Sequence, residues 1–135
     1  MIIPLAIGLT MLLNNSGADA TKVQISFQEA QSVEEYVHEY FADIPVMIDV
    51  ARCESRFRHF GKNGAVLRGE LTPADVGVMQ INETYHKKTA DKMEINLHSI
   101  DGNLAYARYL FEKEGTTPWL ASSRCWGKHQ HVARK

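Results

Sequence analysis

The chain of 135 residues lacks a long hydrophobic run, has little net charge and contains only two cysteines. The apolar stretch at residues 2–13 is interrupted by Gly8 and Thr10 and is too short to span a bilayer. A formal net charge of −1 creates no overall field that would attract nucleic acid or a membrane surface. The hydrophobic fraction of 44% and the charged fraction of 23% are those of an ordinary globular protein, and the length suits one domain.

Several motifs of metal and nucleotide chemistry are also missing. Six histidines are present, but there is no His-Glu-x-x-His pair and no cysteine pair at zinc spacing. The "HQH" run at 129–131 is more typical of a solvated chain end than of a ligand set. No Gly-x-Ser-x-Gly elbow, Walker loop or dinucleotide fingerprint occurs. We therefore expect neither a metal nor a cofactor.

The first twenty residues resemble an export signal. The apolar run is followed by "ADA" at 18–20, which offers small residues at the two positions that an export peptidase reads. This pattern predicts a signal peptide at 1–20 and an exported chain that is periplasmic, cell-wall associated or extracellular. A buried N-terminal helix is the alternative, and Pro4, Gly8 and the polar pair Asn14–Asn15 disfavour it.

The two cysteines, Cys53 and Cys125, are far apart in the sequence. In an exported chain an even pair predicts one disulfide, which would close a loop of about 70 residues and stabilise the fold by roughly 4 kcal/mol. Two free buried thiols are the alternative.

The N-terminal half predicts two helices. Ser32 and Glu35 form a capping box at the start of "SVEEYVHEYFAD". In "DIPVMIDVARCES", Asp43 is a candidate N-cap and Pro45 suits the first turn. The apolar side of this second helix then carries Met47, Val50 and Ala51, with Glu54 next at the same helical spacing.

The rest of the chain predicts a small β element and three more helices. Asn63-Gly64 marks a turn, and 65–69 and 76–81 are candidate partner strands of a hairpin or irregular lobe. Helices are expected at 83–92, from Asp101 to Gly115, and from a Thr117 cap over the last short segment. The core stripe of the long helix is Leu104, Ala107, Leu110 and Phe111. The predicted fold class is α+β, mainly α.

Glu54 and Asp75 are the candidate chemical groups. A carboxyl at the inner edge of an apolar helix face loses solvation, which raises its pKa and keeps the proton that a general acid needs. Asp75 lies just before "VGVMQIN", across the predicted lobe. Two carboxyls in unlike environments facing a cleft can cleave a glycosidic bond.

"CESRFR" followed by "DVGVMQIN" resembles the lysozyme superfamily, specifically the soluble-lytic-transglycosylase (SLT) type, over about residues 44–126. "GNLAYARYL" at 102–110 is similar to a third motif of that family. The resemblance implies a lysozyme-like fold, with residues 21–43 as a leading segment and helix and 127–135 as a basic tail. It also implies peptidoglycan glycan strands as the partner.

The family roles transfer to this chain residue by residue. Glu54 matches the catalytic acid and Ser55 the serine that supports it. The resemblance further implies a substrate-facing set made of Gly77, Gln80, Asn103, Tyr106, Tyr109 and Trp119. On helical spacing alone, the two tyrosines are equally well explained by packing.

Two departures from the family bear on the reaction. The usual Ala-Tyr-Asn-x-Gly motif is replaced by "PWLASSRCW", so Trp119 or Trp126 stands in for its tyrosine or fills the core. Asp75 occupies the place of the second carboxylate of animal-type lysozymes. The leading expectation is a lytic transglycosylase that forms 1,6-anhydro-N-acetylmuramic acid. The alternatives are a muramidase using Glu54 and Asp75 and a non-catalytic glycan-binding domain.

Overall fold

The computed structural model describes residues 31–128, which form a mainly helical α+β domain, as predicted. The predicted signal peptide and residues 129–135 of the predicted tail lie outside the described residues. In chain order the elements are α1 (Val33–Tyr40), α2 (Pro45–Ser55), β1 (Asp75–Val76), β2 (Ile81–Asn82), α3 (Glu83–Lys92), α4 (Ile100–Glu114), the 3-10 helix η1 (Thr117–Ser122) and α5 (Ser123–Trp126).

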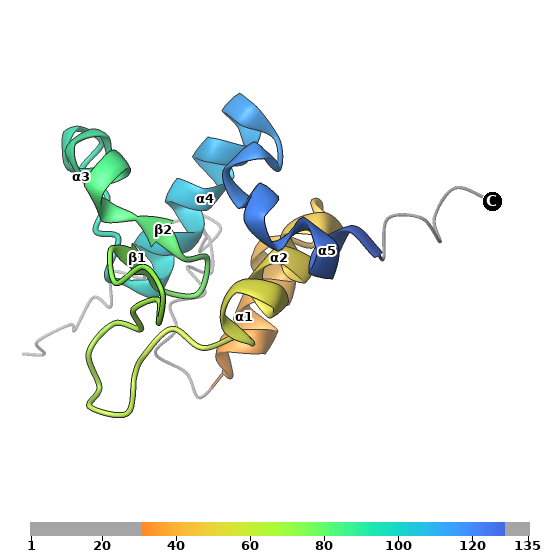
Figure 1. Cartoon of the computed structure of the whole chain (residues 1–135), viewed down its shortest axis with the longest axis horizontal. Coiled ribbons are helices and arrows are strands. Elements are labelled where there is room, and N and C mark those ends of the chain that lie inside the picture. The colour runs from red at the N-terminus through yellow and green to blue at the C-terminus, as the bar shows by residue number, and fades with distance from the viewer. Residues whose placement is uncertain (1–30, 129–135) are drawn as a thin grey trace, which may run out of the picture.

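The other helices and the strands form two groups, one at each side of α4. Figure 1 shows α1, α2 and α5 at one end, α3 and the β1–β2 hairpin at the other, and α4 between them. Within the described part of the chain, no helix is both long enough and apolar enough to cross a membrane.

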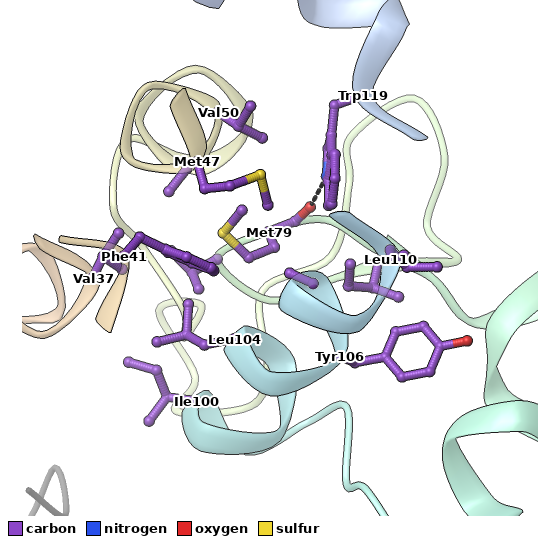
Figure 2. Close-up of a cluster of buried hydrophobic side chains, with 14 of the residues drawn as sticks. Val37, Phe41, Met47, Val50, Met79, Ile100, Leu104, Tyr106, Leu110 and Trp119 are labelled. Atoms are coloured by element: carbon purple, nitrogen blue, oxygen red, sulfur yellow. Dashed lines mark hydrogen bonds between the residues drawn. The ribbon is translucent and has the colours of Figure 1, made fainter. Parts of the chain in front are cut away.

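The core lies where α1, α2 and α4 meet the segment between the strands. Figure 2 shows the side chains of Phe41, Met47, Met79 and Leu104 pointing toward one another from these elements. All four are fully buried. Because α1 contributes to this core, it packs as part of the same domain as the segment that follows it.

The predicted apolar stripes are largely confirmed. Met47, Val50 and Ala51 are fully buried on α2. On α4, Leu104, Ala107 and Leu110 are buried, whereas Phe111 is half-buried at the edge of the core.

The predicted capping box at the start of α1 is confirmed, and α3 has the bounds that the sequence predicts. Ser32 and Glu35 form the capping box, with each side chain bonded to the other residue's backbone N–H. The predicted Asp43 cap is wrong, because α2 begins after Ile44 without a side-chain cap, and Asp43 instead pairs with Arg108 at 2.8 Å.

Two further cap predictions need correction. Ser99, and not Asp101, caps α4 by accepting a hydrogen bond from the N–H of Gly102. The Asp101 carboxylate instead accepts a hydrogen bond from the Tyr36 hydroxyl of α1. Thr117 is the first residue of η1, which has no side-chain cap. In contrast, Gly115 ends α4 as predicted, at a positive φ of 63°.

Of the predicted hairpin between 65–69 and 76–81, one pairing forms: Arg68 and Val76 make an isolated antiparallel bridge. The strands are β1 and β2, paired antiparallel with Val76 opposite Ile81. Between them Gly77 and Gln80 take positive φ values of 75° and 50°, which turns the chain instead of extending it. The other isolated bridge of the 65–69 segment pairs Val66 with Phe60.

Three buried polar side chains hold this turn in place. Nδ1 of His59 accepts from the N–H of Val78, and Oδ1 of Asn103 accepts from the N–H of Met79 at 2.9 Å. The indole N–H of Trp119 donates to the carbonyl of Met79 at 2.9 Å, the bond drawn in Figure 2. These bonds satisfy backbone groups that no regular strand pairs, so the turn has one defined conformation.

Candidate active site

Glu54 lies in the last turn of α2, half-buried and at the edge of the apolar stripe. Burial raises the pKa of its carboxyl, and the negative charge of Asp75 raises it further. A hydrogen bond from the Ser122 hydroxyl acts in the opposite direction and lowers the pKa, but the net shift is upward. Glu54 therefore holds its proton to a higher pH than a free glutamate does, which suits a general acid.

Two adjoining cavities open at Glu54, with volumes of about 300 Å³ and 450 Å³. Both are lined by Glu54, Asp75, Gln80 and Ala121, so they form one continuous groove around the glutamate. The smaller cavity is completed by Ile81, Asn82, Tyr85, His86, Leu110, Glu114, Pro118 and Trp119. The larger one is completed by Arg58, Leu67, Arg68, Gly69, Glu70, Leu71 and Thr72. This groove, referred to below as the cleft, is where an extended polymer could pass the acid.

Asp75 is half-buried on β1 and faces the same cleft as Glu54. Its carboxylate accepts a hydrogen bond of 2.8 Å from Nδ2 of Asn82, its partner across the hairpin. The structure therefore brings together the two carboxylates that the sequence singled out and orients the second through a fixed neighbour.

Gln80, which the resemblance predicts to present a polar group to a sugar, also lines the cleft. Its backbone is in the left-handed region, and its Nε2 donates to the carbonyl of Gly77 at 2.8 Å. A non-glycine residue held at positive φ beside a cleft is a common feature of functional sites.

Asn103 and Gly77 of the predicted substrate-facing set, and Ser55, the predicted support of the acid, do not line the cleft. Asn103 is fully buried, and its side-chain amide forms hydrogen bonds with backbone groups of Val76, Met79 and Leu97. Ser55 is 2% exposed and donates to the carbonyl of Ala51. Gly77 faces protein, because a Cβ there would lie 2.4 Å from Nδ2 of Asn103. These residues shape the site from inside the fold.

Of the three aromatic residues in the predicted substrate-facing set, only Trp119 lines the cleft. Tyr106 is 1% exposed, and Tyr109 packs against its ring with centroids 5.4 Å apart; neither lines the cleft. Trp119 lines the cleft wall, although its side chain is almost wholly buried. Trp126 is buried and donates its indole N–H to the carbonyl of Trp119, so it fills the core.

Cys53 and Cys125 form a disulfide, as predicted. The bond joins α2, one residue before Glu54, to α5, three residues after Ser122. It therefore ties together the two segments that supply the acid and its hydrogen-bond donor.

Three residues of the site are not among those predicted from the sequence: Asn82 and Tyr85, which line the cleft, and Ser122, which binds Glu54. Asn82 is the last residue of the "DVGVMQIN" motif, and Tyr85, three residues later, is an aromatic residue on the polar helix α3. No nearby sequence motif indicates the role of Ser122, because Glu54, the residue that it binds, lies 68 positions away in the chain.

Among residues 31–128, no group of three or more His, Cys, Asp or Glu side chains is placed to hold a metal ion. Comparisons with protein-family models, with curated proteins and with solved structures found no match. The SLT resemblance therefore depends on the sequence motifs alone.

Proposed function

We propose that the protein is an exported enzyme with a lysozyme-like fold that cleaves the β-1,4 bond between N-acetylmuramic acid and N-acetylglucosamine in peptidoglycan. The observation that carries the proposal is a half-buried glutamate of raised pKa at the centre of an open cleft that also holds Asp75. The disulfide is compatible with an oxidising compartment, which supports export.

In the proposed reaction Glu54 acts first as an acid and then as a base. It gives its proton to the bridging oxygen, and the bond from the muramyl C1 to that oxygen breaks. It then takes the proton from the muramyl C6 hydroxyl, whose oxygen bonds to C1 and closes a 1,6-anhydro ring. The proton returns to Glu54, so the cycle consumes no water and needs no cofactor.

Asp75 supports a second candidate, a muramidase. A carboxylate in the same cleft can stabilise or trap the cationic sugar until water arrives. Transglycosylation relies on it less, because the internal hydroxyl is already close to C1. The overall SLT pattern favours the transglycosylase.

Purified protein mixed with peptidoglycan tests the proposal. We expect the turbidity of the suspension to fall and mass spectrometry to find mainly anhydromuropeptides. Mostly reducing-end sugars would favour the muramidase. Binding without any cleavage would favour a non-catalytic glycan-binding domain.

Replacing Asp75 with asparagine should reduce the rate only partly, by about tenfold or less, and leave anhydro products dominant. The amide keeps the shape of the side chain but loses the charge that stabilises the cation. Rates and products of the two proteins would be compared by mass spectrometry. Loss of activity as complete as that caused by removing Glu54 would contradict a transglycosylase.

Tyr85 should contribute to glycan binding, because its side chain is 78% exposed and lines the cleft. Aromatic contacts contribute about 0.5–1.5 kcal/mol, so Tyr85→Ala should raise KM roughly two- to tenfold with kcat little changed. Met93→Ala is the matched control, since Met93 is another exposed apolar residue after α3 that does not line the cleft. An equal rise in KM for both variants would exclude a specific contact by Tyr85.

A further inference from the structure

Ser122 is the only hydrogen-bonding partner of the Glu54 carboxylate among the described residues. Its hydroxyl donates to Oε1 of Glu54 at 2.5 Å. Ser122 is the last residue of η1 and is half-buried. The second carboxylate oxygen, Oε2, has no hydrogen bond within the described part of the chain.

The Ser122 hydroxyl has one hydrogen and two oxygens within reach. The carbonyl of Trp119 lies at 3.1 Å, farther than Glu54, and it already accepts the indole N–H of Trp126 at 3.0 Å. The shorter distance and the unshared acceptor favour donation to the carboxylate, and a bond to a charged acceptor is the stronger one.

Two constraints fix Ser122 in this position. Trp119, three residues before it, is tied to the turn between the strands through the carbonyl of Met79. Cys125, three residues after it, is tied by the disulfide to Cys53 beside Glu54. The segment that carries Ser122 is therefore fixed before and after this residue, and the disulfide also holds the segment beside Glu54.

We propose that Ser122 is the positioning residue of the acid: by binding Oε1 it leaves Oε2 as the oxygen that carries and transfers the proton. An oxygen that accepts a hydrogen bond is the less basic of the two, so the proton resides on the other. This inference rests on the proposed function, because it assigns Ser122 to the same reaction.

The same bond sets the pH range of the acid. Burial raises the pKa of Glu54, and the hydrogen bond from Ser122 opposes that effect. Donation requires the protonated form, so activity falls as pH rises through this pKa. Without the Ser122 hydroxyl the pKa rises, and the alkaline fall in activity moves to higher pH.

The test compares Ser122→Ala, Ser122→Thr and the matched control Ser123→Ala. Ser123 is the neighbouring half-buried serine and makes no side-chain hydrogen bond among the described residues. Two quantities are measured in each protein: the pKa of Glu54, from the NMR shift of its carboxyl carbon, and the pH profile of kcat on peptidoglycan.

We expect Ser122→Ala to raise the Glu54 pKa, shift the alkaline limb upward and lower kcat by roughly tenfold or more, with KM unchanged. Ser122→Thr retains the hydroxyl and should restore both the pKa and most of kcat. Ser123→Ala should behave as wild type. An unchanged Glu54 pKa in Ser122→Ala, or an equal loss of kcat in Ser123→Ala, would overturn the proposal.

The NMR titration also separates this proposal from the proposed function. If the wild-type protein cleaves no glycan, the transglycosylase and muramidase assignments fail together. The titration then decides on its own whether Ser122 holds the Glu54 carboxylate, since it requires no substrate.

Discussion

Glu54→Gln should reduce glycan cleavage by at least about a hundredfold, the usual contribution of a general acid. The amide has nearly the shape of the carboxyl, and its carbonyl oxygen can still accept the hydrogen bond from Ser122. It has no proton to give at any working pH. Cleavage would be followed by the loss of turbidity of a peptidoglycan suspension and by product mass spectrometry.

The matched control is Glu112→Gln, which removes an exposed carboxylate of α4 that does not line the cleft. It should retain full activity. If Glu54→Gln retained more than a small fraction of the wild-type rate, Glu54 would not be the acid.

The same variant should fold at least as stably as wild type. Because the folded pKa of Glu54 is raised, the wild-type protein loses stability as pH rises from the unfolded value of about 4.5 through the folded one. Glutamine does not ionise and avoids this loss. Urea unfolding of both proteins should therefore show the larger advantage for Glu54→Gln at neutral pH and little difference below the unfolded pKa.

The features that the sequence predicted correctly depend on residues close together in the chain. The capping box of Ser32 and Glu35 spans one turn, and Gly115 ends its helix through its own backbone freedom. The stripe of Met47, Val50 and Ala51 follows from helical spacing alone. These rules need no knowledge of tertiary structure.

The features that it missed depend on distant partners. Asp43 and Asp101 each stand where a helix cap is expected, but one binds Arg108 and the other accepts from Tyr36, both 65 positions away. The 76–81 segment pairs with 65–69 only at Val76, because the positive φ values of Gly77 and Gln80 turn the chain after it.

The motif residues show a related limit. The resemblance singled out Asn103 and Gly77, and the structure makes them neighbours, but as a packed pair that supports the turn before Gln80. A motif indicates that a residue matters to a family. Only the contacts show whether it touches the cleft or holds the residues that do.

Replacing both Cys53 and Cys125 with serine should lower the free energy of unfolding by about 4 kcal/mol, because the disulfide closes a long loop in the unfolded chain. The bond also holds α5 against α2, next to both Glu54 and Ser122. The rate should therefore fall even under conditions in which the variant remains folded.

Three measurements separate these effects. Peptide mapping of the purified protein without reductant should recover the two cysteines as one linked pair. Urea unfolding gives the stability of the double variant, and kcat on peptidoglycan is then measured well below its unfolding midpoint.

A loss of stability without a loss of kcat would mean that the disulfide only restricts the conformations of the unfolded chain. Two free thiols in the purified protein would contradict both roles. A loss of both quantities, with the pKa of Glu54 raised toward that of Ser122→Ala, would show that the covalent bond acts on the reaction through the contact between Ser122 and Glu54.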